Sequence, residues 1–285
     1  MKDLNNNFYK RCSKCVMDTT DKYIIFDENG ICNHCKSFAD LYSKTCFHNK
    51  EGNYKLELVV KKIKKFGMRN KYDSILGLSG GLDSTYAALK AFELGLNPLV
   101  IHIDAGWNSE LAVSNIEALV KYCNYDLYTH VVNWEDMKNL QLAYLKAGVS
   151  NQDVPQDHIF LTSIYKFAAR NNIKFIISGG NTATEGIFPE SWLWSNIDSI
   201  NLKDIYNSFC KRKFINYETT NLFQYYFWYP FIKRIRVIRL LNYMQYNKSK
   251  ALKELSEKID FKPYERKHGE SIFTSFYQNY YLPEK

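Results

Sequence analysis

The sequence predicts an α/β fold built around a parallel sheet. Four short apolar runs alternate with stretches whose apolar residues recur at helical spacing. This alternation indicates βαβ units, whose strands are covered by helices on both faces and are therefore apolar throughout. The expected strands are residues 74–78, 99–103, 127–132 and 175–177, and the expected helices are residues 85–94, 111–122, 134–146 and 158–171.

Composition divides the chain into three regions. Residues 1–50 are rich in cysteine and turn formers, residues 51–185 hold the strand and helix alternation, and residues 186–285 are aromatic, basic and mostly helical. A chain of 285 residues, 46% of them hydrophobic, suffices for one large domain with appendages. The polar start lacks a signal-peptide core, and no run of 18 apolar residues occurs. We therefore expect a cytoplasmic protein that makes no use of a membrane.

The net charge of +8 suits a polyanionic ligand such as a nucleotide, a nucleotide-sugar or RNA. No block of five consecutive basic residues occurs, so a mildly basic surface also explains the charge. We favour the second interpretation and expect no nucleic-acid partner, except in the tRNA alternative given below.

A glycine-rich turn, SGGLDS at residues 79–84, joins the first expected strand to the first expected helix. Gly80 and Gly81 lack Cβ, so the backbone there turns sharply and approaches a ligand closely. The first N–H groups of the helix and its dipole form an anion site, to which Ser79 and Ser84 add hydroxyl donors. Asp83 repels phosphate and is explained as a helix cap or as a Mg²⁺ or network ligand. The turn is neither a Walker loop nor G-x-G-x-x-G.

Four cysteines form two C-x-x-C pairs, Cys12 with Cys15 and Cys32 with Cys35, separated by 16 residues. This spacing is typical of a four-thiolate zinc site, and four thiolates leave no open position on the metal. The sequence therefore predicts a structural Zn²⁺ knuckle. The other cysteines are expected to be buried small hydrophobic residues: Cys46, Cys123 and Cys210.

The hexapeptide at residues 79–84 resembles the pyrophosphate loop of the ATP-pyrophosphatase (PP-loop) superfamily, which has an adenine-nucleotide α-hydrolase-like fold. The resemblance implies that ATP is cleaved between its α- and β-phosphates. A carbonyl oxygen is adenylated, and a nucleophile then displaces AMP. ATP and Mg²⁺ are the implied cofactors.

Six stretches carry a more specific resemblance: RCSKCVMDTT at 11–20, FDENGIC at 26–32, GWNSELAV at 106–113, PQDH at 155–158, SGGNTATE at 178–185 and KHGES at 267–271. Together they resemble the N-acetyl sugar amidotransferases of surface-polysaccharide (lipopolysaccharide O-antigen) and nonulosonic-acid biosynthesis. These enzymes are understood to convert an acetamido group of an activated sugar into an acetamidino group. A partner glutaminase supplies the ammonia, and the implied substrate is a nucleotide-activated N-acetyl sugar.

The chain departs from that family at two places. Gly269 and the pair Glu265-Arg266 replace the residues usual there, and family members continue beyond Lys285. We therefore expect a further C-terminal helical part to be missing.

Position along the chain suggests roles for further residues. His102 and Asp104 end the second strand and are expected near adenosine, Asp104 as a Mg²⁺ or ribose ligand or equally as a turn cap. Gly179, Asn181 and Glu185 follow the fourth strand and are expected to face the same crevice, with Glu185 as the first choice for a general base.

Two more groups of residues are candidates with open alternatives. Lys267 and His268 either neutralise pyrophosphate or lie on the surface. A polar loop is expected between two helices, where it either contacts sugar or ammonia or is solvated, with Asp157 capping the next helix. Its residues are Gln152, Asp153, Gln156, Asp157 and His158.

Two alternative functions remain. A tRNA-thiolating PP-loop enzyme shares the zinc and the loop, but that branch needs further cysteines near the active site, and no third pair is present. The other alternative is a non-catalytic scaffold subunit that docks a glutaminase.

Overall fold

The structure of the chain is a computed structural model that describes residues 9–47, 49–189, 195–266 and 268–284. Its centre is a five-stranded sheet in the order β3-β2-β1-β4-β5, with every neighbouring pair parallel. The predicted α/β fold with a parallel sheet is confirmed. The strands are β1 (Ser74–Gly77), β2 (Pro98–Asp104), β3 (Leu127–Val131), β4 (Phe175–Ser178) and β5 (Arg236–Arg239).

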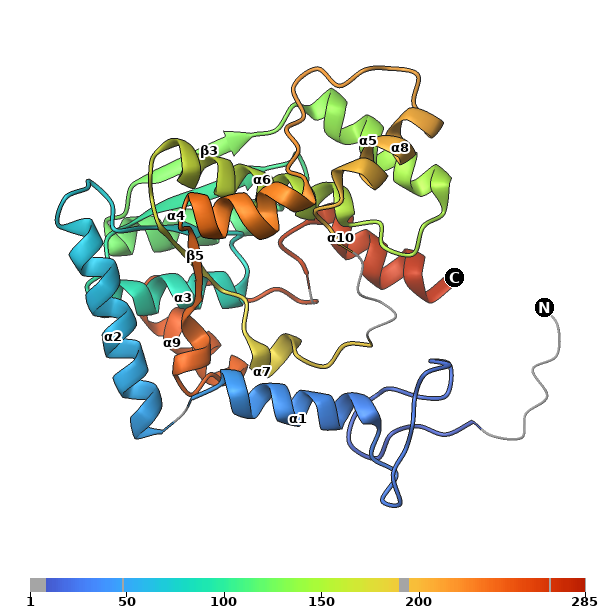
Figure 1. Cartoon of the computed structure of the whole chain (residues 1–285), viewed down its shortest axis with the longest axis horizontal. Helices are drawn as coiled ribbons and strands as arrows, with labels where there is room; N and C mark the ends of the chain where they lie inside the picture. Colours follow the sequence, from blue (N-terminus) through green and yellow to red (C-terminus); the bar gives the residue numbers. More distant parts are fainter. Residues whose placement is uncertain (1–8, 48, 190–194, 267, 285) are drawn as a thin grey trace.

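Helices pack on both faces of the sheet (Figure 1). Alternate strand residues enter two separate cores, because successive side chains of a strand point to opposite faces: Leu76 and Val100 face one core, and Ile75 and Ile101 the other. The first core is built by α2 (Lys50–Gly67), α3 (Leu82–Glu93), α4 (Glu110–Cys123), the 3₁₀ turn η3 (Leu240–Tyr243) and α9 (Lys248–Ile259). The second is built by α5 (Trp134–Ala147), α6 (Val154–Arg170), α8 (Ser199–Phe209) and the π-helix η2 (Gln224–Ile232).

The remaining helices are short or peripheral. They are α1 (Asn33–Thr45), α7 (Thr182–Glu185), α10 (Ile272–Phe276), the π-helical turn η4 (Tyr277–Tyr281) and the 3₁₀ turn η5 (Leu282–Glu284). Local chemistry sets many helix starts: the side chains of Asn49, Ser109 and Asn133 accept a backbone N–H in the first turns of α2, α4 and α5. None of the helices that the structure describes is long and apolar enough to cross a bilayer.

The structure differs from the sequence prediction at the sheet edges. Strand β5 was expected to be helix, and β3 was expected to be buried on both faces. Both are edge strands, and Val131 and Val237 have exposed fractions of 69% and 43%. Strand β5 also brings a segment from beyond residue 185 into the sheet, whereas the rest of the described C-terminal region has no further strand.

Candidate functional site

The chain runs outward from β1 through β2 to β3 and then returns to the other side of β1 to form β4. The carboxyl ends of β1 and β4 therefore flank the point where the strand order reverses. Ligands of open parallel sheets bind in the crevice at this point. A cavity of about 760 Å³ opens here, which we call the switch-point cavity. Its wall includes the 79–84 loop, the glycine pair after β4 and residues of the segment after α9.

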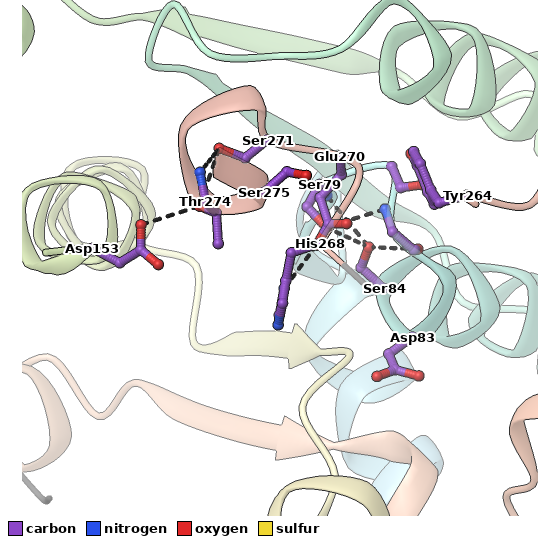
Figure 2. Close-up of polar contacts among 12 residues, drawn as sticks. Ser79, Asp83, Ser84, Asp153, Tyr264, His268, Glu270, Ser271, Thr274 and Ser275 are labelled. Carbon is purple, nitrogen blue, oxygen red and sulfur yellow. Dashed lines mark hydrogen bonds and ion pairs between the residues drawn. The ribbon is translucent and has the colours of Figure 1, made fainter. Parts of the chain in front are cut away.

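The 79–84 loop is held by its two serines (Figure 2). The hydroxyls of Ser79 and Ser84 lie 3.0 Å apart, and Ser79 Oγ accepts the N–H of Gly81 at 3.3 Å. Gly81 is the N-cap of α3, and no side chain caps this helix. The N–H groups of the first turn of α3 therefore keep their capacity to bind an anion in the cavity.

Gly80 and Gly179 allow two close backbone approaches that any side chain would prevent. Gly80 has φ +80°, and a Cβ there would lie 2.6 Å from the carbonyl oxygen of Ala112 on α4. A Cβ on Gly179 would lie 2.5 Å from Cα of Ser84. The loop after β1 is thus packed between α4 and the loop after β4, and Gly179 lies beside Ser84 of the 79–84 loop.

Asp83 is the second residue of α3, not its cap. Its carboxylate accepts a hydrogen bond from Tyr246 Oη and lies 3.9 Å from Lys248 Nζ. Desolvation and the charge of Asp83 raise the pKa of Glu185, which also lines the cavity. Two carboxylates and a lysine therefore converge beside the 79–84 loop. Neither Tyr246 nor Lys248 was singled out in the sequence, because both come from the helical region far along the chain.

Glu185 is the last residue of α7, which follows the glycine pair after β4, and Asn181 directly precedes this helix. Asn181 caps α7 by accepting the N–H of Thr184 at 3.0 Å, and its own N–H donates to Glu185 Oε2 at 3.3 Å. The Nδ2 group of Asn181 is buried and has no hydrogen-bond partner among the described residues. The carboxylate of Glu185 is therefore held by the backbone of Asn181 and lines the switch-point cavity; its role as a general base stays a prediction.

His102 and Asp104 at the end of β2 form one hydrogen-bond network with Asn108. His102 Nδ1 donates to the carbonyl oxygen of Leu78 at 2.9 Å, and Nε2 accepts from Asn108 Nδ2 at 2.9 Å. Asp104 Oδ1 accepts from Gly106 N at 2.8 Å and from Asn108 Nδ2 at 3.0 Å. His102 lines the cavity, and Asp104 caps the turn, which was one of its two predicted roles.

The segment between α9 and α10 (residues 260–266 and 268–271), which we call the roof, lies against the 79–84 loop, and Figure 2 shows Glu270 and Tyr264 near Ser79 and Ser84. Tyr264 Oη donates to the carbonyl oxygen of Gly80 at 2.8 Å. Glu270 lies 3.5 Å from His268 Nδ1. Desolvation opposes ionisation of Glu270, but the hydrogen bonds from His268 and from the backbone, together with the charges of His268 and Lys248, lower its pKa. The roof supplies side chains that the sequence analysis missed, apart from His268. Lys267, the other predicted cation there, lies outside the described residues.

The segment at residues 152–158 does not form the polar loop predicted between two helices. Helix α6 already begins at Val154, with Pro155 in its first turn. A proline is tolerated there because the N–H groups of the first turn have no partner within the helix, so the missing N–H costs no hydrogen bond. His158 is structural: its Nδ1 donates to Asn196 O at 2.8 Å, and its Nε2 accepts from Thr220 N at 3.2 Å. Gln156 lines the cavity and accepts from Ser271 Oγ at 3.1 Å.

Asp157 neither caps α6 nor lines the switch-point cavity. Its Oδ2 accepts from Asn196 Nδ2 at 2.7 Å. Desolvation and the nearby charge of Asp153 raise the pKa of Asp157 to about 7. Asp153 is bonded to Thr274 Oγ1 at 3.1 Å. Asp153 thus connects the start of α6 to α10, whereas Asp157 connects α6 to the segment before α8. Unlike Asp83 and Glu185, Asp157 does not line the switch-point cavity.

The four knuckle cysteines converge on one point. Their sulfur atoms all lie within 4.8 Å of one another, with Cys12 and Cys35 at 3.9 Å and Cys15 and Cys32 at 3.6 Å. Four sulfurs bound tetrahedrally to zinc at 2.3 Å are about 3.8 Å apart. The residues therefore fit a Zn²⁺ ion. His34 is not a ligand, since its Nε2 pairs with Asp21 at 2.6 Å.

Backbone N–H groups stabilise the thiolate form of Cys12, which is the form that binds a metal. The N–H groups of Lys14 and Cys32 both donate to Cys12 Sγ at 3.3 Å. Against desolvation, these bonds lower the pKa of Cys12 to about 6. Cys32 also caps α1, so the same site fixes the start of that helix. Outside the knuckle, Cys46 and Cys123 are buried as predicted, and Cys210 is half-buried.

The sequence matches no protein-family profile and no curated protein. Solved structures are similar in part. The NH₃-dependent NAD synthetase of Campylobacter jejuni has 18% identity and a TM-score of 0.34, over 46% of this chain and 58% of that one. The NMN synthetase of Francisella tularensis has 16% identity and a TM-score of 0.36, over 77% and 98%. The U34-tRNA thiolase of Methanococcus maripaludis, solved with its [4Fe–4S] cluster, has 14% identity and a TM-score of 0.41, over 96% and 84%.

The chain thus spans 58% of the length of the NAD synthetase to which it is similar. Similarities of this size do not distinguish a synthetase from a thiolase. The fold assignment therefore rests on the strand order and register, and the site on the contacts described above.

Proposed function

We propose that the chain is an ATP-dependent amidotransferase that adenylates the acetamido oxygen of an activated N-acetyl sugar and then replaces that oxygen with ammonia. One observation supports the binding of ATP. The N-terminus of α3, which no side chain caps, lies at the switch point, and there Ser84 of α3 packs closely against Gly179 of the loop after β4. The resemblance at six stretches supports the sugar part and a partner glutaminase as the source of ammonia.

The chain's own groups fit the charges of this reaction. The first turn of α3, with Ser79 and Ser84, would bind the β- and γ-phosphates. Lys248 adds a cation on the same wall. Asp83 offers the carboxylate oxygens that Mg²⁺ prefers, and the bound ion would neutralise charge on the phosphates. Glu185, with its raised pKa, would take up the proton that the attacking ammonia releases.

The atoms of the reaction balance without an oxidant. The acetamido oxygen attacks the α-phosphorus, a P–O bond forms, and pyrophosphate leaves. Ammonia then adds to the carbon, loses a proton and expels AMP, which retains the former acetamido oxygen. The products are an acetamidine, AMP and pyrophosphate. Because an amide is a poor electrophile, the adenylation is what makes attack by ammonia feasible.

The transfer of that oxygen provides the test. Purified protein is incubated with ATP, ammonium chloride and UDP-N-acetylglucosamine or related nucleotide-sugars whose acetyl group carries ¹⁸O. We expect AMP and pyrophosphate to form only with the sugar, and mass spectrometry to find the ¹⁸O in AMP. Formation of ADP in place of AMP would refute the proposal.

The same assay separates the alternatives. AMP that forms with tRNA and not with any sugar would indicate the thiolating enzyme. Against that alternative, no cysteine is among the described residues that line the switch-point cavity. Absence of AMP under every condition, together with binding of a glutaminase, would indicate the scaffold subunit.

A further inference from the structure

A second cavity of about 720 Å³ lies between the zinc knuckle and the sheet, and we call it the knuckle cavity. One wall is the exposed face of α1, with Asn33, Ser37 and Leu41. The other wall is α7 and the residues after it. Its volume falls within the range of small-molecule sites.

The packing of α1 against α7 shapes this cavity (Figure 1). Thr45 Oγ1 on α1 donates to Thr182 Oγ1 on α7 at 3.0 Å. A Cβ on Gly186 would lie 2.7 Å from the ring of Phe38. The two helices therefore touch closely at these residues, while the face of α1 nearer the knuckle stays open. Because Cys32 caps α1, the cysteine site also positions this wall.

Glu185 and Arg239 line both the knuckle cavity and the switch-point cavity. The two cavities therefore meet at the carboxyl ends of β4 and β5, beside the phosphate loop. A ligand in the knuckle cavity would place one end next to the proposed general base. A second substrate of a nucleotide-activating enzyme needs this arrangement, since its reacting oxygen must reach the α-phosphate.

Two groups at this junction have unused hydrogen-bonding capacity. The guanidinium of Arg239 is exposed and forms no hydrogen bond or ion pair with any residue in the described part of the chain. The buried Nδ2 of Asn181 has no partner there either. Leaving a buried donor unpaired is unfavourable, and an arginine fork matches the oxygens of a phosphate. Both groups thus favour a ligand that accepts hydrogen bonds and carries negative charge.

The rest of the lining favours a polyhydroxylated ligand. It offers the hydroxyl of Ser37, and beside it the Asn33 amide and the Thr182 hydroxyl, which are held in place by hydrogen bonds within the protein. The ring of Tyr23 has an exposed fraction of 58%, and Lys22 Nζ lies 4.9 Å from its centroid. Polar groups that donate and accept, set beside an aromatic face, match a sugar ring, which has both hydroxyls and an apolar face.

We propose that the knuckle cavity is the acceptor site of the enzyme and binds a phosphate-bearing, polyhydroxylated small molecule, a nucleotide-activated sugar, with Arg239 on its phosphate and the reacting amide at Glu185. This inference rests on the proposed function, because it places the second substrate of that reaction.

Two pairs of variants test the site. Arg239→Gln removes the free cation, and its control is Arg236→Gln on the opposite face of the same strand, which lines neither cavity. Ser37→Trp fills the cavity from α1, and its control is Ala39→Trp, an exposed position two residues along that lines neither cavity. The readouts are the affinity for α,β-methylene-ATP by calorimetry and the affinity for UDP-N-acetylglucosamine and related UDP- and CMP-sugars by saturation-transfer NMR.

We expect at least one nucleotide-sugar to bind the unaltered protein. Arg239→Gln and Ser37→Trp should each weaken that binding at least tenfold. Ser37→Trp, which lies outside the switch-point cavity, should change the affinity for the ATP analogue less than twofold, and both controls should leave the two affinities unchanged. Equal sugar affinity in all four variants would overturn the inference, as would failure of every nucleotide-sugar to bind, or weakening of the ATP analogue alone by Arg239→Gln. Binding of tRNA in place of the sugars, sensitive to the same variants, would also overturn it.

The two proposals fail in different ways. Loss of the inference leaves the binding of the ATP analogue and the formation of AMP intact. Failure of the proposed function shows in the unaltered protein, which would then bind no ATP analogue or would form ADP.

Discussion

Gly80→Ala tests whether the phosphate loop needs its glycine for close packing as well as for its backbone angle. At φ +80° an L-residue is strained by about 1–2 kcal/mol. The new Cβ would also lie 2.6 Å from the carbonyl oxygen of Ala112 and 3.0 Å from its Cα, and both are backbone atoms of α4 that cannot rotate away. Overpacking of this kind destabilises by about 1–3 kcal/mol. The expected total loss of unfolding free energy is therefore about 2–5 kcal/mol.

Gly148→Ala is the matched control, because Gly148 also has a positive φ, +63°, but a Cβ there meets nothing within 4 Å. This variant should lose only the backbone strain, about 1–2 kcal/mol. Chemical denaturation gives the two free energies, and calorimetry with α,β-methylene-ATP gives the two affinities. We expect Gly80→Ala to bind the analogue at least tenfold more weakly and Gly148→Ala to bind it normally. Equal losses of stability in the two variants, with unaltered affinity in both, would refute the reasoning.

Three further predictions concern the metal and two carboxylates. Removal of zinc by a chelator, or Cys15→Ser, should abolish the one bound zinc per chain found by metal analysis and expose the knuckle to proteolysis, while the separate cores beside the sheet keep their thermal transition. Because the pKa of Asp157 is raised to about 7, the folded protein keeps a proton that the unfolded chain loses, so stability should fall as pH rises from about 4 to 7. Asp157→Asn should remove this fall and gain about 1–3 kcal/mol at pH 8 in denaturation experiments; a steeper fall would contradict the assignment. Against desolvation, Lys258 and Lys90 lower the pKa of Glu254 to about 2, so the stability that these pairs contribute is present above pH 4.5 and is lost as pH falls toward 2. Glu254→Gln should therefore lose about 1 kcal/mol at pH 7 in low salt and almost nothing at pH 2, and a loss independent of pH would count against the pairing.

Much of the fold could be read from the sequence because local patterns were strong. The four apolar runs became β1 to β4, and each expected helix is present, since strand and helix periods differ clearly in these segments. Strand β5 was not predictable in this way. Its sequence, Arg-Val-Ile-Arg, lacks a continuous apolar run because this edge strand is exposed at three of its four residues and need not be apolar on both faces.

The candidate site likewise has residues that the local sequence identified and residues that it did not. The loop at residues 79–84, the four cysteines and the glycines after β4 are compact in sequence, so their roles followed from residue type and spacing. Tyr264, Lys248 and Arg239 carry no local signal, and Glu270 was assigned no role although it lies in the KHGES stretch. These residues line the cavity only because the C-terminal segments return over the sheet. Asp157 is the opposite case: it was predicted to be catalytic, but it does not line the cavity, whereas Gln156 next to it does.

The sequence by itself determined where the chain turns, which turn can bind an anion and which thiols can share a metal, because these depend on residues within about 25 positions of one another. Only the tertiary structure decided which charges surround that anion and that the knuckle forms one wall of a second cavity. Side chains separated by more than 150 residues, such as Asp83 and Tyr246, meet through packing of helices on a common sheet. That packing is fixed by burial across the whole domain and not by any local spacing.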